Sequence, residues 1–90
     1  MHNIFLIEDD PKIAQNIAQY FNSKDFKVFP FQQGGKALEQ ITNLKPDLVL
    51  LDLNLPDLSG IEVLKKIKQQ DAKLPVIVLT GYVSTQSAIE

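Results

Sequence analysis

Acidic or hydroxyl side chains directly follow three short apolar runs of this sequence. They are Glu8, Asp9 and Asp10 after residues 4–7, Asp52 after residues 48–51, and Thr80 after residues 76–79. Two carboxylates about 4 Å apart repel by roughly 4 kcal/mol at an effective dielectric near 20, so carboxylates that converge need a compensating cation. A few carboxylates with one carbonyl oxygen and open water positions suit Mg²⁺. The spacing therefore predicts a magnesium site if these runs are strands that end at one edge of a sheet.

Asp52 is also the best candidate for a nucleophile. It lies between Leu51 and Leu53 at the end of an apolar run. A metal-bound carboxylate can attack phosphorus and form an acyl phosphate, and the Thr80 hydroxyl can donate a hydrogen bond to a phosphoryl oxygen. In the alternative interpretation, the acids are helix caps or solvated loop charges and Thr80 is a turn residue.

The elements that must position these side chains follow from the apolar pattern. Residues 4–7, 48–51 and 76–79 are uninterrupted apolar runs, which are typical of parallel strands buried on both faces. Residues 25–31 alternate in part, and Pro30 lacks a backbone donor, so this segment is predicted to be an edge strand.

Segments with helical spacing lie between these strands. Their apolar positions are Ile13, Ile17 and Phe21; Ala37, Leu38 and Ile41; and Ile61, Leu64 and Ile67. The signals for helix starts and ends are Asp10 before Pro11, Gly34-Gly35, Lys45-Pro46, and Ser59 three residues before Glu62. Alternating strands and helices predict one α/β domain over residues 1–90, with a doubly wound parallel sheet whose site lies beyond the carboxyl ends of the strands.

Composition excludes several other classes of protein. The 90 residues carry a net charge of −2, which argues against direct nucleic-acid binding. Without cysteine, the chain has no disulfide or zinc-thiolate site. The first apolar run has four residues before Glu8, too few for a signal peptide or a membrane span, so we expect a cytoplasmic protein without membrane contact.

Three motifs together resemble a known family. They are Glu8-Asp9-Asp10-Pro11, the stretch Leu50-Leu51-Asp52-Leu53-Asn54-Leu55-Pro56-Asp57-Leu58-Ser59-Gly60, and Val76-Ile77-Val78-Leu79-Thr80-Gly81. In these residues the chain resembles the receiver domain of two-component response regulators. The resemblance implies a flavodoxin-like (CheY-like) fold with strand order 2-1-3-4-5. It also implies that a sensor histidine kinase donates a phosphoryl group to Asp52, which switches a regulatory surface.

The resemblance assigns a role to each residue of the expected site. Asp9 and Asp52 bind Mg²⁺ together with the backbone carbonyl of Asn54, and Glu8 acts through water. Thr80 is the switch hydroxyl. Asn54 and Tyr82 flank the path by which water attacks the acyl phosphate.

The chain departs from the family pattern at its carboxyl end. The resemblance implies a fifth strand that carries a lysine, followed by a closing helix, and the 90 residues end before them. We therefore expect strand order 2-1-3-4, truncated before strand 5. Either the chain is a piece of a longer regulator with an output domain, or copies associate through the exposed sheet edge.

Two other functions stay open. Without the lysine, the chain could be a binding module that is not lastingly phosphorylated. Alternatively, Asp52-Leu53-Asn54 loosely resembles the D-x-D motif of phosphohydrolases that form an aspartyl phosphate, although Asn54 replaces the acid–base carboxyl.

Overall fold

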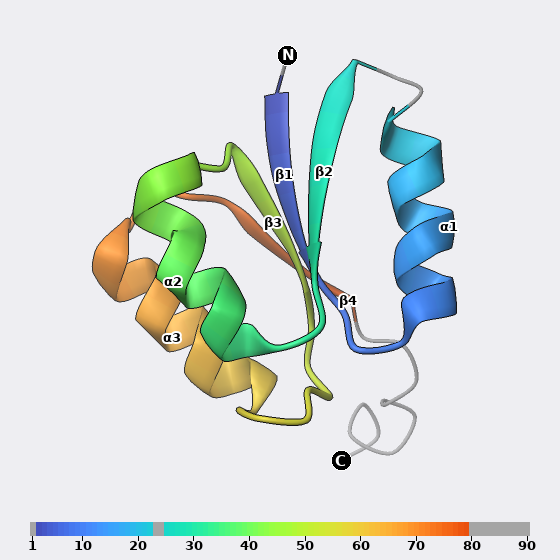
Figure 1. The fold of residues 1–90 in the computed structure, drawn as a ribbon. Helices are drawn as coiled ribbons and strands as arrows, with labels where there is room; N and C mark the ends of the chain where they lie inside the picture. The colour runs from blue at the N-terminus through green and yellow to red at the C-terminus, as the bar shows by residue number, and fades with distance from the viewer. Residues whose placement is uncertain (1, 23–24, 80–90) are drawn as a thin grey trace.

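Strands and helices alternate along the chain, as the sequence pattern predicts. A computed structural model describes residues 2–22 and 25–79. Within these residues the elements are β1 (His2–Ile7), α1 (Pro11–Asn22), β2 (Phe26–Phe31), α2 (Gly34–Leu44), β3 (Leu48–Asp52), α3 (Gly60–Gln70) and β4 (Val76–Leu79) (Figure 1).

The strands form one parallel sheet in the order β2-β1-β3-β4. This confirms the expected strand order 2-1-3-4. The order reverses at β1, which pairs with β2 on one side and with β3 on the other. Both β1 and β3 therefore end at the same edge of the sheet, side by side (Figure 1).

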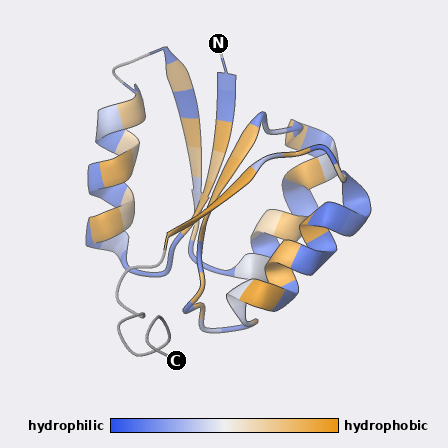
Figure 2. Ribbon diagram, turned by 180° about the vertical axis from the view of Figure 1, so that it is seen from behind, coloured by the Kyte–Doolittle hydropathy of each residue, from blue (hydrophilic) through white to orange (hydrophobic). Residues whose placement is uncertain are grey.

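Helices cover both faces of the sheet. Helix α1 lies on one face, and α2 and α3 lie side by side on the other (Figure 1). Side chains alternate between the two faces along a strand, so Phe5 and Ile7 pack toward α2 and α3 while Ile4 and Leu6 pack toward α1. Most strand residues are accordingly apolar, with exceptions at the amino end of β1, at Lys27 of β2 and at the last residue of β3, whereas the helices are polar on their outer faces (Figure 2). Two apolar layers, one between the sheet and α1 and one between the sheet and the pair α2 and α3, hold the strand ends rigidly in place.

Two helices begin at the caps that the sequence predicts. The Asp10 carboxylate accepts hydrogen bonds from the N–H groups of Lys12 and Ile13, at 2.9 and 3.4 Å, at the start of α1. The Ser59 hydroxyl accepts one from the Glu62 N–H, at 3.2 Å, at the start of α3. Both capped ends lie at the edge of the sheet where the strands end.

Helix α2 ends where the Lys45-Pro46 pair predicts. Lys45 has φ 46°, in the left-handed region, and its N–H donates to the Ile41 carbonyl.

Three details differ from the sequence prediction. Strand β1 begins at His2, two residues before the apolar run at residues 4–7. Strand β2 begins at Phe26, because Asp25 is in a turn with φ 83°. Ile77 in β4 is 53% exposed, although the sequence predicts that this strand is buried on both faces. Ile77 is on the α1 face by alternation, and α1 lies over β1 and β2, so no helix in the described part of the chain covers it.

The helices are short and amphipathic. Among the described residues, none forms a helix that is both long enough and apolar enough to cross a bilayer.

Candidate functional site

The carboxyl ends of β1 and β3 bring three acidic side chains together. Ile7 of β1 pairs with Leu51 of β3, so the residues that follow this pair meet at the edge of the sheet. Carboxylate oxygens of Glu8, Asp9 and Asp52 lie within 4.8 Å of one another. We call these three residues the acidic cluster. The predicted convergence depended on β1 and β3 being neighbours, and they are.

Glu8 is the buried member of the cluster, with 5% of the residue exposed. Its backbone N–H donates to the Phe31 carbonyl at 2.9 Å, and its Oε2 accepts from the Asp10 N–H at 3.1 Å. Burial raises the pKa of Glu8 above its ordinary value, and the nearby charges of Asp52 and Asp9 raise it further, although the Asp10 N–H opposes the shift. The cluster therefore holds negative charge at a cost in free energy, which a cation would offset.

Asp52 is half-buried and is the last residue of β3. Its Oδ1 accepts a hydrogen bond from the N–H of Asn54 at 3.3 Å. Asn54 is exposed and lies in the β3–α3 loop, residues 53–59. The predicted carbonyl ligand thus belongs to a residue that is hydrogen-bonded directly to the cluster.

Close packing under this loop explains Gly60. A glycine at such a position has two common reasons, a crowded backbone or a positive φ. The structure supports the first, because a Cβ at Gly60 would lie 2.4 Å from the Leu53 Cα and 3.0 Å from the Asp52 carbonyl oxygen. Gly60 also donates its N–H to the Leu53 carbonyl at 3.0 Å. The start of α3 is therefore pressed against the backbone that follows Asp52.

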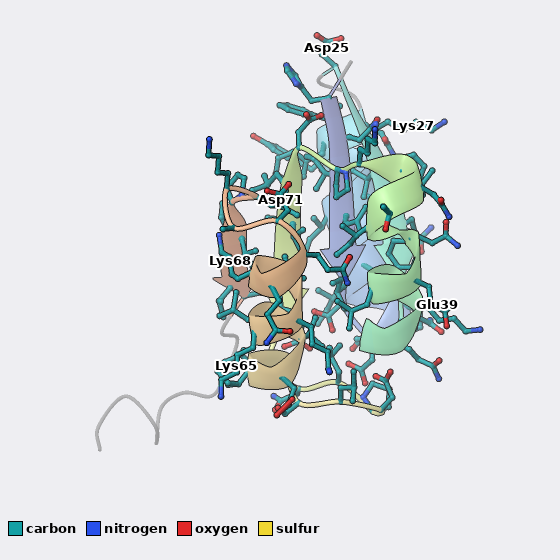
Figure 3. The ribbon with its side chains drawn as sticks, turned by 90° about the vertical axis from the view of Figure 1, so that its left-hand side faces the viewer. Asp25, Lys27, Glu39, Lys65, Lys68 and Asp71 are labelled. Atoms are coloured by element: carbon teal, nitrogen blue, oxygen red, sulfur yellow. The ribbon has the colours of Figure 1, made fainter. Side chains whose placement is uncertain are left out.

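The remaining predicted site residues, Thr80 and Tyr82, lie outside the described residues. Two lysines on α3, Lys65 and Lys68, can be followed in Figure 3. The Lys68 ammonium donates to the Leu74 carbonyl, before the start of β4 and so at the opposite end of that strand from Leu79. The ammonium group of Lys68 is therefore hydrogen-bonded at a distance from the acidic cluster.

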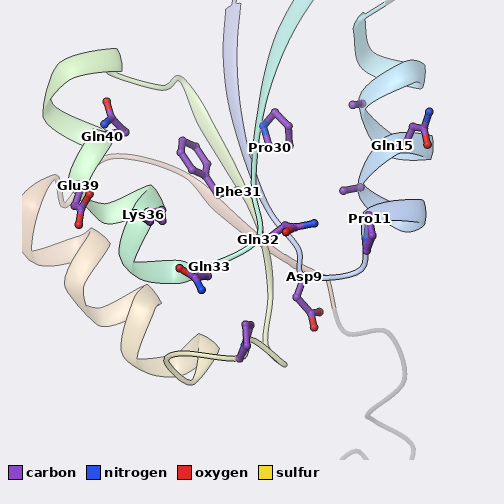
Figure 4. Close-up of a pocket in the computed structure, with 13 residues that line it drawn as sticks. Asp9, Pro11, Gln15, Pro30, Phe31, Gln32, Gln33, Lys36, Glu39 and Gln40 are labelled. Atoms are coloured by element: carbon purple, nitrogen blue, oxygen red, sulfur yellow. The ribbon is translucent and has the colours of Figure 1, made fainter.

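A groove opens beside the cluster. It has a volume of about 1050 Å³ and lies between α1 and α2 along β2 (Figure 4). Asp9 lines this groove and also belongs to the acidic cluster, and Pro56 of the β3–α3 loop contributes to the lining. Asp9 is thus reachable from the outside along this side of the molecule.

The donor set of the cluster fits a hard divalent cation. Three carboxylates supply oxygen ligands from a rigid sheet edge, and the exposure of Asp9 leaves room for water. Mg²⁺ prefers oxygen ligands and retains several waters, so it suits this arrangement better than metals that favour nitrogen or sulfur.

Sequence reasoning missed the role of Asp57. Its carboxylate accepts hydrogen bonds from the N–H groups of Gly34 and Gly35, at 2.9 and 2.8 Å, although these residues are more than 20 positions away. The only signal in the sequence was indirect: Gln33, which precedes α2, is a poor N-cap residue.

Comparison with known proteins agrees with the fold and with the acidic cluster. The family model for the response regulator receiver domain matches residues 4–90. The chain belongs to the response regulator receiver domain family. Receiver domains are signalling modules, and an acidic pocket that takes Mg²⁺ is typical of them.

Curated relatives of this receiver domain are longer proteins. The cell cycle response regulator CtrA of Brucella ovis is 36% identical over 86 residues, which are 96% of this chain and 37% of that protein. The chain thus spans little more than a third of the length of this relative.

Solved receiver structures share the fold. A CheY-like receiver domain protein from Methanospirillum hungatei JF-1 superposes with a TM-score of 0.89 at 28% identity, covering 99% of this chain and 71% of that one. The response regulator TrrA, solved in complex with the histidine kinase ThkA, gives a TM-score of 0.85 at 28% identity over 91% of this chain and 71% of the matched one.

Proposed function

We propose that this receiver domain accepts a phosphoryl group on Asp52 from a sensor histidine kinase, in a Mg²⁺-dependent reaction that switches a regulatory surface. The observation that carries the proposal is the acidic cluster. Three carboxylates within 4.8 Å, one of them buried, repel one another unless a cation is bound.

Asp52 is the member of the cluster best suited to be the nucleophile. Its backbone is held by the parallel pairing of Asp52 with Leu79 and by the packing of β3, so the carboxylate has a defined position. One of its oxygens attacks the phosphorus of a phosphohistidine, an O–P bond forms, and the P–N bond breaks so that the histidine nitrogen keeps the electron pair. The product is an acyl phosphate on Asp52.

The other residues of the site hold the cation. Asp9, Asp52 and the Asn54 carbonyl would bind Mg²⁺, and Glu8 would act through a water molecule. When bound, Mg²⁺ neutralises charge on the phosphoryl oxygens. Phosphorylation then adds a charge of about −1.5 to −2 at the sheet edge, to which the Thr80 hydroxyl would respond by a hydrogen bond.

A histidine kinase is the proposed partner because it supplies the phosphoryl group. The similar regulator TrrA was solved in complex with such a kinase. We also propose that the protein acts in the cytoplasm. We assign the output function of the regulator to the part that relatives such as CtrA possess beyond the matched length.

Intact-mass spectrometry tests the proposal. The chain is incubated with Mg²⁺ and phosphoramidate, a small phosphodonor, and a mass increase of one phosphoryl group is expected. Asp52→Asn should abolish the increase, because the amide is not a nucleophile toward phosphorus. Asp25→Asn is the matched control, since it removes the same charge at the opposite end of the sheet, in a turn whose positive φ suits Asn (Figure 3).

Three outcomes would contradict the proposal. No mass increase and no binding of beryllofluoride, from a chain that is folded by circular dichroism, would favour the binding-module function. Incorporation that persists in Asp52→Asn would mean that another residue is the acceptor. Continuous turnover of a phosphate ester would instead favour the phosphohydrolase.

A further inference from the structure

The β3–α3 loop is tethered to a helix that is distant in the sequence. Both carboxylate oxygens of Asp57 accept hydrogen bonds from the first turn of α2: Oδ1 from the Gly34 N–H at 2.9 Å and Oδ2 from the Gly35 N–H at 2.8 Å. In the described part of the chain, the other hydrogen bonds of this loop go to β3 and α3. Asp57 therefore provides the polar link between the loop and α2.

The N-terminal end of helix α2 has no side-chain cap from its own N-cap residue. Gln33 at its N-cap position is extended, and its side chain makes no capping hydrogen bond. The first N–H groups of a helix have no partner within the helix, so an outside acceptor is needed. The charge of Asp57 strengthens both hydrogen bonds, and these bonds lower the pKa of its carboxyl. The N–H groups of Gly34 and Gly35 and both carboxylate oxygens of Asp57 therefore all have hydrogen-bond partners.

Apolar contacts reinforce the tether. A Cβ built on Gly34 would lie 2.5 Å from the Val63 Cγ2 and 3.3 Å from the Leu55 Cδ1, so only glycine allows the first turn of α2 to approach this closely. Leu55 and Leu58, on either side of Asp57 in the loop, pack against the core.

Asn54 lies near the start of the same loop and is held by a longer hydrogen bond than those of Asp57. Its N–H donates to Asp52 Oδ1 at 3.3 Å, and Asp52 is the proposed acceptor of the phosphoryl group. Once Asp52 is an acyl phosphate, its own carboxyl oxygens no longer carry a negative charge and are poorer hydrogen-bond acceptors than the oxygens of a carboxylate. This attachment therefore weakens during the reaction, while the Asp57 tether is unaffected.

We propose that Asp57 is a positioning residue for the Mg²⁺ site: by tethering the β3–α3 loop to α2, it holds the Asn54 carbonyl where it can bind the metal. Asp57 itself contacts neither the metal nor the phosphoryl group. This inference rests on the proposed function, because it assigns Asp57 to the same site.

The test measures how phosphorylation by phosphoramidate depends on the Mg²⁺ concentration. Asp57→Ala is expected to raise the half-saturating Mg²⁺ concentration by about tenfold, as is common when a group that orients a metal ligand is lost. The rate at saturating Mg²⁺ should stay close to that of the parent, because the nucleophile is intact. Asp57→Asn keeps one acceptor oxygen and should give a smaller shift, which provides a second variant if the alanine variant does not fold.

Ser59→Ala is the matched control. It removes the cap of α3 from the same loop but leaves the tether to α2 in place, so it should cost stability without moving the Mg²⁺ dependence. An unchanged half-saturating concentration in both Asp57 variants, or equal shifts in Asp57→Ala and Ser59→Ala, would overturn the inference. If the parent chain takes up no phosphoryl group, the proposed function fails, and the Mg²⁺ dissociation constants from calorimetry still decide the role of Asp57.

Discussion

Glu8 shows how burial and charge combine at a single residue. It is the one buried polar or charged residue in the part of the chain that the structure describes, and it faces two further carboxylates. Its raised pKa means that the folded chain binds a proton on Glu8 more tightly than the unfolded chain does. The contribution of Glu8 to stability is therefore complete below its ordinary pKa of 4.5 and is lost as the pH rises through the pKa of the folded state.

The pH dependence of stability should change in Glu8→Gln. Without metal, we expect the variant to gain free energy of unfolding relative to the parent as the pH rises from about 4.5 to 7, since glutamine removes a charge that is unfavourable in the fold. Urea denaturation across this pH range, with a chelator present, measures the difference.

Glu39→Gln provides the comparison for this experiment. Glu39 is an exposed residue of α2, so its replacement removes the same charge outside the acidic cluster (Figure 3). A difference curve for Glu8→Gln that is flat, or that falls with rising pH, would contradict the assigned direction of the Glu8 pKa shift.

At the scale of elements, the β3–α3 loop connects Asp52, the proposed phosphoryl acceptor, to both helices on its face of the sheet. Gly60 presses the start of α3 against Leu53, and Asp57 joins the loop to α2. Such a loop has little freedom to move without displacing a helix. Changes at Asp52 can therefore be transmitted to the helices through this segment.

Gly60→Ala should destabilise the chain by about 1–3 kcal/mol, the usual cost of forcing extra volume into a packed site. The added Cβ would lie 2.4 Å from the Leu53 Cα, which is backbone and can move away only together with β3. Urea denaturation gives the free energy of unfolding.

Gly35→Ala tests whether this cost comes from the backbone contact. A Cβ at Gly35 would meet the end of a side chain, Asp57 Oδ2, at 3.2 Å. We expect a smaller loss of stability than for Gly60→Ala. Equal losses in the two variants would mean that crowding at Leu53 is not the reason for Gly60.

At the scale of the whole molecule, the sheet is the rigid support of the site. Two apolar layers, one under α1 and one under α2 and α3, fix β1, which Glu8 directly follows, and β3, which ends at Asp52. The acidic cluster is assembled only in the folded chain, because its members are 44 residues apart at the extremes, from position 8 to position 52. A cation that binds the cluster should therefore stabilise the entire fold.

The unfolding midpoint should rise with the Mg²⁺ concentration. At about 100 times the dissociation constant, the expected gain is about 2.7 kcal/mol. Thermal denaturation followed by circular dichroism measures the effect, with NaCl at equal ionic strength as the control for screening. Asp52→Asn should be more stable than the parent without Mg²⁺, because one repulsive charge is gone, and should gain much less from Mg²⁺. An equal gain in the parent and in this variant would place the cation elsewhere.

The sequence by itself determined the alternation of strands and helices, the caps at Asp10 and Ser59, and the edge position of β2. These features depend on local periodicity and on hydrogen bonds between residues a few positions apart. The spacing of polar residues after the apolar runs predicted that Glu8, Asp9 and Asp52 converge, and the structure brings them together. The strand order and the role of Asn54 came from the family resemblance, and the family and the strand order are confirmed. The roles of Asp52, Asn54, Thr80 and the metal remain predictions.

Only the tertiary structure decided which distant groups meet. It placed β1 beside β3, so that three carboxylates crowd together; it left Ile77 exposed, because α1 does not extend over β4; and it joined Asp57 to Gly34. A helix start without its own cap reveals a need for an acceptor but does not say which residue supplies it. That choice depends on how the loop and the helices pack against the sheet, and packing between segments more than 20 residues apart has no local signal in the sequence.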